Sequence, residues 1–308
     1  MTDMRAALED YLAVRRHLGF VLKRDGQLLP QFVDYLEAAG TGRVTISAAL
    51  SWAMAPQDAH PAWWASRLNI VRGFARYLRA LDPSHEVPPT GMLRGSRPRK
   101  APYLYSDDDV SALMQAARDL GPPYRAAIYE TLVGLLAVSA LRLGEALGLD
   151  RDDVDLDHGA LTVRRAKFNK AREVPVHPTT VEALARYAEI RDQQWPTTTT
   201  DAFFVSVHGL RLGAGTVHDL FRGLVRQSGL EGRGSRCRPR PHDFRHSFAV
   251  TSLMEWYMSG EDVEARLPLL STFMGHVDPV STYWYFEAAP ELLELAAQRL
   301  GRVFGAKP

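Results

Sequence analysis

The sequence has a single cysteine, Cys237, and it has no long run of apolar residues. One thiol excludes an internal disulfide and disfavours a structural zinc site, because such sites usually draw on several thiolates. No apolar run approaches the roughly 18 residues that a membrane helix needs, and the polar start from Met1 to Asp10 does not resemble an export signal. We therefore expect a cytoplasmic protein that does not act in a membrane.

The sequence also lacks a strong net charge, which is only +1. The distribution is uneven, however, since residues 1–100 hold 14 Lys and Arg against 9 Asp and Glu. Two clusters rich in Gly and Pro hold many of the basic residues, namely Arg94, Arg97, Arg99 and Lys100, and then Arg233, Arg236, Arg238, Arg240 and Arg245. Each cluster alone is typical of a solvated loop, and two in one chain make DNA binding an equal alternative.

At 308 residues the chain is long enough for two domains, each with its own core. Apolar residues at three- and four-residue spacing predict helices over 4–18, 27–39, 46–54 and 61–81. A segment rich in Pro and basic residues follows. We predict a helical DNA-binding domain over 1–87, a basic linker over 88–104 and a second domain over 105–308.

The second domain is predicted to be mainly α with a small β-sheet. Its pattern indicates a helix over 107–120, a long apolar helix over 124–147 and turns over 150–158. Alternation and β-branched residues over 160–165 and 172–177 predict a β-hairpin. Further helices are predicted over 180–194, 216–228, 241–259, 262–274, 280–286 and 290–304. No internal repeat is present, which argues against a structural repeat protein.

Three segments carry residues suited to phosphate chemistry. His242 and Arg245 stand three apart on a predicted helix, so that they share a face and can hold one phosphate, although such pairs also occur by chance on solvated helices. Arg142 ends a very apolar helix, where it needs an anion, and Glu145 alone could satisfy it. His276 follows a glycine, and Tyr285 comes nine residues later among aromatic residues that would usually be core.

Together these segments resemble the tyrosine recombinase (phage integrase) family, whose signature is Arg, Lys, His-x-x-Arg, a Gly-His pair and a nucleophilic Tyr in that order. The resemblance extends over about residues 103–300. It implies an α-rich catalytic domain, and an N-terminal core-binding (SAM-like) domain that matches the family in kind only. The implied catalytic set is Arg142, Lys167, His242, Arg245, His276 and the nucleophile Tyr285, with Glu145 in support.

Two positions have a rival within the same segment. Lys167 matches the family lysine better than Lys170, and Tyr285 matches the family spacing from the Gly-His pair better than Tyr283. The chain also departs from the common family pattern at Ala140, Phe244 and Ser247, where Gly, Leu and Thr are usual, and we expect small packing changes there. The long segment 249–275 resembles integrases of mobile elements.

The resemblance implies site-specific DNA recombination through a 3'-phosphotyrosyl intermediate and a Holliday junction, without metal, ATP or another cofactor. The expected partners are double-stranded DNA sites, three further copies in a tetrameric synapse, and other recombinases or accessory DNA-bending proteins; without DNA the protein would be monomeric or weakly associated. We expect it to be associated with the nucleoid. The residues expected to bind DNA are Arg94, Arg97, Arg99, Lys100, Lys170, Arg172, Arg236, Arg238 and Arg240.

Three alternatives stay open. The chain could be an accessory subunit that binds its site without cutting, although every catalytic side chain is present. A type IB topoisomerase or a telomere resolvase would use similar residues on one duplex. The segment over 290–304, which is amphipathic, could pass to a neighbouring subunit or pack on its own domain.

Overall fold

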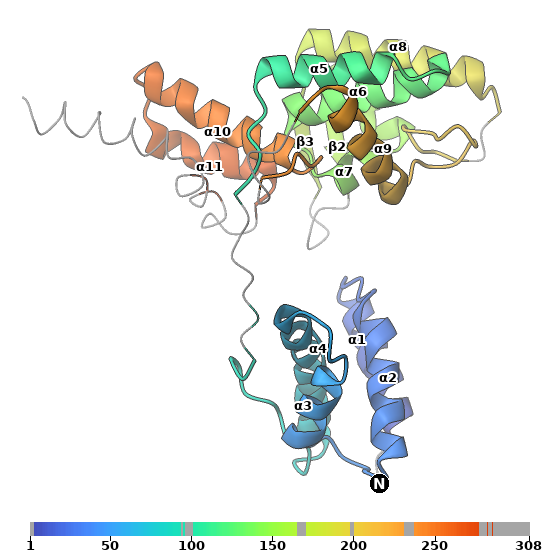
Figure 1. Cartoon of the computed structure of the whole chain (residues 1–308), viewed down its shortest axis with the longest axis vertical. Helices are drawn as coiled ribbons and strands as arrows, with labels where there is room; N and C mark the ends of the chain where they lie inside the picture. The colour runs from blue at the N-terminus through green and yellow to red at the C-terminus, as the bar shows by residue number, and fades with distance from the viewer. Residues whose placement is uncertain are drawn as a thin grey trace, which may run out of the picture. The chain divides into compact units, whose positions relative to one another are not determined.

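A computed structural model of the chain describes residues 3–93, 95, 101–164, 171–197, 200–230, 237–276, 282 and 285. The chain divides into two compact units, Met1–Arg99 and Lys100–Pro308. In Figure 1 the helices of the first unit are blue and those of the second run from green to orange. No helix in the described part of the chain is long and apolar enough to cross a membrane.

The described part of the N-terminal unit is helical throughout. Its helices are α1 (Met4–His17), α2 (Asp25–Ala38), α3 (Ile46–Met54) and α4 (Pro61–Leu81). Apolar side chains from all four helices close one core, in which Leu29, Phe32 and Phe74 are fully buried. The side chains of Thr45 and His60 accept hydrogen bonds from first-turn backbone N–H groups of α3 and α4, which fixes where these helices begin. The predicted all-helical N-terminal domain is confirmed.

The described ends of the predicted linker each pack against a unit. Arg72 of α4 donates from Nε to the Pro88 carbonyl and from Nη2 to the Pro89 carbonyl, both at 2.7 Å. At the other end, the side chains of Tyr103 and Tyr105 are buried in the core of the second unit. The basic residues Arg94, Arg97, Arg99 and Lys100 lie outside the described residues. The limits of the linker therefore stay a prediction.

The second unit consists of helices that pack mainly against one another, together with a small antiparallel sheet (Figure 1). Its helices are α5 (Asp107–Arg118), α6 (Pro123–Ser139), α7 (Leu143–Gly148), α8 (Pro178–Gln194), α9 (Ala214–Gln227), α10 (Asp243–Met258) and α11 (Val263–Met274), with a 3-10 turn η1 (Arg151–Asp153). The sheet has the order β1 (Val154–Asp155), β2 (Ala160–Val163) and β3 (Arg172–Pro175). Strands β2 and β3 form the predicted hairpin, with Val163 opposite Arg172. The mainly α fold with a small sheet is confirmed.

The long helix predicted over 124–147 is wrong, because the chain breaks at Ala140. This residue has φ 51° and ψ 17°, a left-handed conformation that ends α6 at Ser139. Arg142 is extended and forms the N-cap of α7, so it does not lie in a helix. The apolar pattern runs on through the break because residues on both sides are buried, and an alanine gives no signal of a conformation that costs it about 1–2 kcal/mol.

A second apolar cluster of this unit lies around α10 and α11, which pack against each other (Figure 1). Leu253 of α10 and Met274 of α11 are fully buried in it, and Tyr285 joins the same cluster with 2% of its surface exposed. Apart from Thr282 and Tyr285, the helices predicted over 280–286 and 290–304 lie outside the described residues.

Candidate active site

Arg245 is buried where two helices end and a third begins. It lies in the first turn of α10 and exposes 2% of its surface. Its Nη1 donates to the carbonyl of Ala140 and its Nη2 to the carbonyl of Met274, both at 2.6 Å. These carbonyls lie at the C-terminal ends of α6 and α11, where backbone oxygens lack partners within the helix and favour a cation. The fold therefore fixes this guanidinium without any bound anion.

Glu145 holds Arg142 at two points. Its carboxylate accepts from Nη1 of Arg142 at 2.6 Å and from the Arg142 backbone N–H at 2.9 Å. Nη2 of Arg142 donates to the carbonyl of Gly275 at 3.3 Å. The side chain of Arg142 keeps 38% of its surface exposed, whereas that of Glu145 keeps 8%. The pair therefore orders the start of α7 and still leaves part of the arginine open to an anion.

Arg172 is a second arginine on the same carboxylate. Standing at the first position of β3, it donates from Nη2 to Glu145 at 2.8 Å and from Nη1 to the other oxygen at 3.2 Å. Its Nε donates to the carbonyl of Phe273 at 3.1 Å. The expectation was that Arg172 contacts DNA, but its guanidinium is bound inside the protein and its side chain exposes only 11%.

His276 is oriented by a turn and a hydroxyl group. Gly275 ends α11 with φ 67°, a conformation that favours glycine. A Cβ at this position would also lie 2.6 Å from Nη1 of Arg172. Nδ1 of His276 lies 2.7 Å from Oγ1 of the buried Thr282, so one side of the ring is held by the protein.

The ring of Tyr285 lies against two histidines, His246 in α10 and His276 just beyond the end of α11. It is nearly parallel to the His276 ring, with centroids 6.1 Å apart, and tilted to the His246 ring at 5.5 Å. The ring of His246 is in turn 4.8 Å from that of His242. The structure thus brings together Arg142, Glu145, His242, Arg245, His276 and Tyr285, which are far apart in the sequence.

Burial and the arginines set the protonation states of this group. Burial raises the pKa of Tyr285, while the charge of Arg245 and a hydrogen bond from it oppose the rise. Burial and the positive charge of Arg245 lower the pKa of His242 and bring that of His276 to about 4. Burial lowers the pKa of Arg245 itself to about 10, so it remains a cation at neutral pH. The site therefore combines cationic arginines, neutral histidines and a protonated tyrosine.

A carboxylate remains charged within this cluster. Burial would raise the pKa of Glu145, but hydrogen bonds from Arg172 and Arg142 outweigh it and lower the pKa to about 2. Glu145 therefore stays a permanent anion, and its charge must be counted in the balance of the site.

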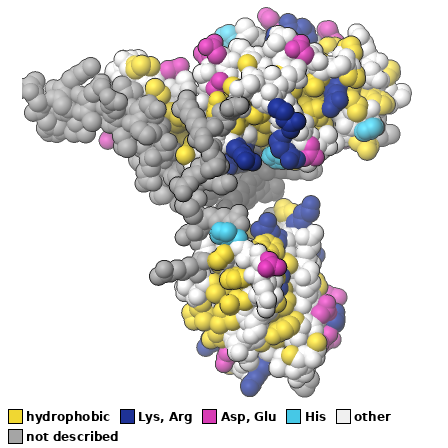
Figure 2. All heavy atoms as spheres, viewed as in Figure 1, with side chains coloured by type: hydrophobic (Ala, Val, Ile, Leu, Met, Phe, Trp, Pro, Cys, Tyr) yellow, Lys and Arg dark blue, Asp and Glu magenta, His cyan; other side chains and the backbone are white. Residues whose placement is uncertain are grey.

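The other residues expected to bind DNA lie elsewhere or outside the described chain. Arg238 is exposed, and Arg240 forms a two-point ion pair with the buried Asp243 at 2.6 Å and 3.0 Å. Lys167, its rival Lys170, and Arg236 lie outside the described residues, as does Tyr283, the rival nucleophile. Figure 2 shows Lys and Arg side chains at several separate places on the visible face of the second unit, with acidic side chains among them. Their role in DNA binding stays a prediction.

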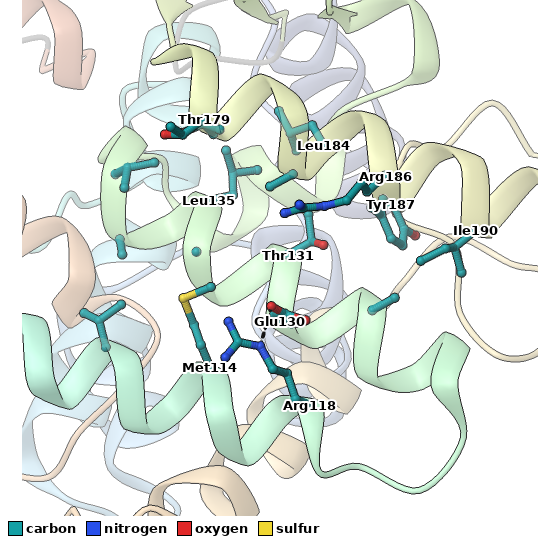
Figure 3. A pocket seen from close by; sticks show the side chains of 17 residues that line it. Met114, Arg118, Glu130, Thr131, Leu135, Thr179, Leu184, Arg186, Tyr187 and Ile190 are labelled. Carbon is teal, nitrogen blue, oxygen red and sulfur yellow. Dashed lines mark hydrogen bonds and ion pairs between the residues drawn. The ribbon is translucent and has the colours of Figure 1, made fainter.

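A pocket of about 600 Å³ lies between α5, α6 and α8 (Figure 3). Apolar and polar side chains both line it, and Arg118 and Glu130 among them form an ion pair at 2.7 Å. None of the residues that resemble the catalytic set lines this pocket. The cluster around Arg245 is therefore the candidate active site.

This cluster lies within a segment that matches a known family. The model of the phage integrase family matches residues 104–291. The chain is 42% identical to a putative integrase/recombinase, y4rB, of Sinorhizobium fredii over 98% of each chain. It is 31% identical to the tyrosine recombinase XerC of Alcanivorax borkumensis, over 78% of this chain and 72% of the relative. The chain belongs to the phage integrase family of tyrosine recombinases.

A solved structure shares the fold. A lambda integrase tetramer bound to a Holliday junction aligns with a TM-score of 0.57 at 17% identity, over 92% of this chain and 76% of that chain. At this identity the likeness concerns the fold alone.

Sequence reasoning missed three contributors to the cluster. Arg172 was expected to bind DNA, but it forms an ion pair with Glu145, which lies 27 residues away in the sequence. Thr282 gave no signal, because a threonine among aromatic residues resembles any helix position. His246 could have been found, since it follows His242 by four residues and such residues share a helix face.

Proposed function

We propose that this protein is a site-specific DNA recombinase that cleaves and rejoins strands through a 3'-phosphotyrosyl link to Tyr285, and exchanges strands through a Holliday junction to integrate or excise a mobile element. The observation that carries the proposal is the buried Tyr285 beside Arg245, with Arg142 in the same cluster. Membership of the phage integrase family supports the same reaction.

The arginines would stabilise the transition state. A phosphodiester resists attack because its non-bridging oxygens are already negative, and their charge grows during the reaction. Guanidinium groups bind two phosphate oxygens at once and stay charged at any relevant pH. Arg245 is held by backbone carbonyls and Arg142 by Glu145, so neither needs to be ordered when DNA binds.

The histidines would move or hold protons. The hydroxyl of Tyr285 is a poor nucleophile while protonated, and burial raises its pKa further. A neutral histidine can accept the proton, and His242 is our choice as general base, with His276 donating a hydrogen bond to a phosphoryl oxygen. Lys167 would donate a proton to the departing 5'-oxygen. The link conserves the bond energy, and a 5'-hydroxyl of another strand reverses it, so the proposed reaction needs no ATP. It needs no metal, because Arg142 and Arg245 supply the positive charge beside the phosphate.

Recombination joins two duplexes and therefore needs four protomers. The solved lambda integrase structure with the same fold is a tetramer on a Holliday junction, which supports the same assembly here. We propose that double-stranded DNA sites bring four copies together. In this assembly the segment over 290–304 either passes to a neighbour or packs on its own domain. A truncation after residue 289 that still forms tetramers on DNA would contradict this exchange.

The test traps the covalent complex on a DNA substrate nicked beside the cleavage position. Bound fragments are first selected from the source DNA to find the site, and EDTA is present throughout. We expect a protease-sensitive protein–DNA adduct with the native protein and with Tyr283→Phe, and none with Tyr285→Phe. No adduct on a demonstrably bound site would favour an accessory subunit that does not cut.

A second assay separates recombination from the chemistry of a single duplex. Two labelled duplexes that carry the site are mixed with the native protein, and exchanged products are counted. A recombinase yields products with one arm from each duplex, whereas a topoisomerase or a telomere resolvase reseals strands of one duplex only.

A further inference from the structure

Arg172 has all three nitrogen atoms of its guanidinium group engaged inside the site. Nη1 and Nη2 bind the two oxygens of Glu145 at 3.2 Å and 2.8 Å, and Nε binds the carbonyl of Phe273 at 3.1 Å. Parallel bonds of this kind from one guanidinium to one carboxylate fix both groups in orientation as well as in distance. With 11% of its side-chain surface exposed, Arg172 is not placed as a surface contact for DNA.

We propose that Arg172 is a positioning residue for the active site, an inference that rests on the function proposed above. It acts through Glu145 on Arg142, and through the end of α11 on His276. A single side chain on β3 thus joins the start of α7 to the end of α11, and these two elements carry one arginine and one histidine of the catalytic set.

The charge balance of the cluster gives Arg172 a specific task. Glu145 is a buried anion, and its pKa of about 2 keeps it charged. With Arg172 present, one positive charge offsets Glu145, and the charges of Arg142 and Arg245 are left for a phosphate. Without Arg172, the carboxylate would hold Arg142 as its main counterion, and the site would lose one positive charge where the negative charge of the reaction develops.

The turn that carries His276 depends on the same side chain. Nη1 of Arg172 occupies the space beside Gly275, since a Cβ there would be 2.6 Å away. The backbone N–H of His276 donates to the Ser271 carbonyl at 2.9 Å as α11 ends. The Phe273 carbonyl, which Arg172 binds, lies within this same turn. Arg172 therefore caps the C-terminal end of α11, directly before His276.

The test compares Arg172→Gln and Arg172→Lys with a matched control, Arg211→Gln. Arg211 also pairs with a carboxylate, that of Asp150, and donates to the carbonyls of Leu147 and Leu149 at 2.9 Å and 3.1 Å. It thus anchors the other end of α7 and touches no residue of the catalytic cluster in these bonds. Its loss removes a similar set of interactions without changing the charge beside Glu145.

In single-turnover assays on the nicked substrate, Arg172→Gln should form adduct about 10²-fold more slowly than the native protein. Arg172→Lys, which keeps the charge but not the fork, should recover part of that rate, and Arg211→Gln should be within about twofold. The affinity for intact DNA and its salt dependence should stay unchanged, whereas loss of a phosphate contact would lower the salt slope by about 1. In a cycle with Glu145→Gln, the double variant should be no slower than the slower single variant.

Three results of the cleavage and binding assays would overturn the inference. They are a native rate in Arg172→Gln, a fall in rate matched by weaker DNA binding with a lower salt slope, and additive losses in the double variant. Hydrogen exchange provides a readout that needs no cleavage: backbone N–H groups of Ala146 and His276 should lose protection in Arg172→Gln and Arg172→Lys but not in Arg211→Gln. Unchanged protection in Arg172→Gln would refute the positioning role, whether or not the native protein forms an adduct. The absence of an adduct with the native protein would instead count against the proposed function.

Discussion

Both units bury arginines on backbone carbonyl oxygens, yet their surroundings differ. In the N-terminal unit, Arg67 donates to one carbonyl at 2.8 Å and Arg72 donates to two at 2.7 Å. In the second unit, Arg245 donates to two carbonyls at 2.6 Å. Burial lowers the pKa of all three guanidinium groups. As arginines, they are held in the same way.

The difference lies in what shares the space around each guanidinium. The bonds of Arg67 and Arg72 join neighbouring segments of one helical core. Arg72 also has a second cation near it, Arg76, which lowers its pKa. Around Arg245 the second cation, Arg142, is joined by a tyrosine, Tyr285, whose pKa both arginines lower against the effect of burial. In both units a buried arginine joins segments of the chain through backbone carbonyls. The candidate active site differs because two arginines lie beside a tyrosine.

The largest effect on the rate of adduct formation is expected from a substitution of Arg245, and a substitution of Arg72 serves as the comparison. Arg245→Lys keeps one charge but cannot span both carbonyls, so adduct formation per folded molecule should fall by about 10²- to 10³-fold. Arg72→Gln should leave that rate near native while it lowers the free energy of unfolding by about 1–3 kcal/mol. Single-turnover assays and urea unfolding measure the two quantities. If both variants lost rate equally, the distinction between the two arginines would fail.

A smaller effect is expected from the hydroxyl group that holds His276. Thr282→Val removes the partner of Nδ1 at 2.7 Å and nearly keeps the side-chain volume. The ring should then lose its fixed orientation, and adduct formation should slow by about tenfold. Thr272→Val is the control, because its hydroxyl binds the Pro268 carbonyl within α11 at 2.9 Å. Equal losses in the two variants would show that the loss is not specific to the hydroxyl group that holds His276.

Features that depend on local sequence pattern were predicted correctly. Amphipathic spacing and caps predicted α3 and α4 at their observed bounds, since each helix buries one face. The hairpin was visible because its strands alternate. The order of Arg142, His-x-x-Arg, Gly-His and Tyr indicated the family, and the structure brings the described members of that set into one cluster.

What the sequence did not reveal depends on contacts between distant segments. Ala140 adopts a left-handed conformation in the middle of an apolar run, and its carbonyl binds Arg245, which is 105 residues away. In the sequence Arg172 is an ordinary arginine of a hairpin strand, and only the structure shows that it binds Glu145. Local pattern carries no information on such pairings, so they appear only when the helices pack.

Stability at acid pH should depend on two partly buried histidines of the second unit, His246 and His276. Burial lowers the pKa of His276 from 6.5 to about 4 and that of His246 from 6.5 to about 3. Below pH 6.5 these two histidines are therefore protonated in the unfolded chain but not in the folded chain. The free energy of unfolding falls as the pH falls from 6.5 toward 4. Urea unfolding between pH 7.5 and 5 should show this fall, and His246→Phe should reduce its slope.

Hydrogen exchange of the full chain localises the same effect. After correction for intrinsic rates, protection in α10 should fall more between pH 7 and 5 than protection in α4. A uniform change across the two units would contradict the assignment to His246 and His276.

The smallest effect is expected at Ala140, where the strain of the break can be relieved. Ala140→Gly removes the cost of the left-handed conformation, about 1–2 kcal/mol, but adds freedom to the unfolded chain and loses a fully buried methyl group. These contributions oppose one another, so the free energy of unfolding should change by less than about 1 kcal/mol. The adduct rate should stay within about twofold, because the carbonyl that binds Arg245 remains in place.

The opposite substitution separates strain at the site from strain elsewhere. Leu22 of the N-terminal unit also has a positive φ, 46°, against 51° for Ala140. A β-branched side chain is strained at either position, so Ala140→Val and Leu22→Val should both lower the free energy of unfolding. Only Ala140→Val should also slow adduct formation per folded molecule, since it shifts a carbonyl that holds Arg245. If Leu22→Val slowed adduct formation to the same degree, backbone strain in either unit would limit the reaction, and the anchoring of Arg245 would lose its special place.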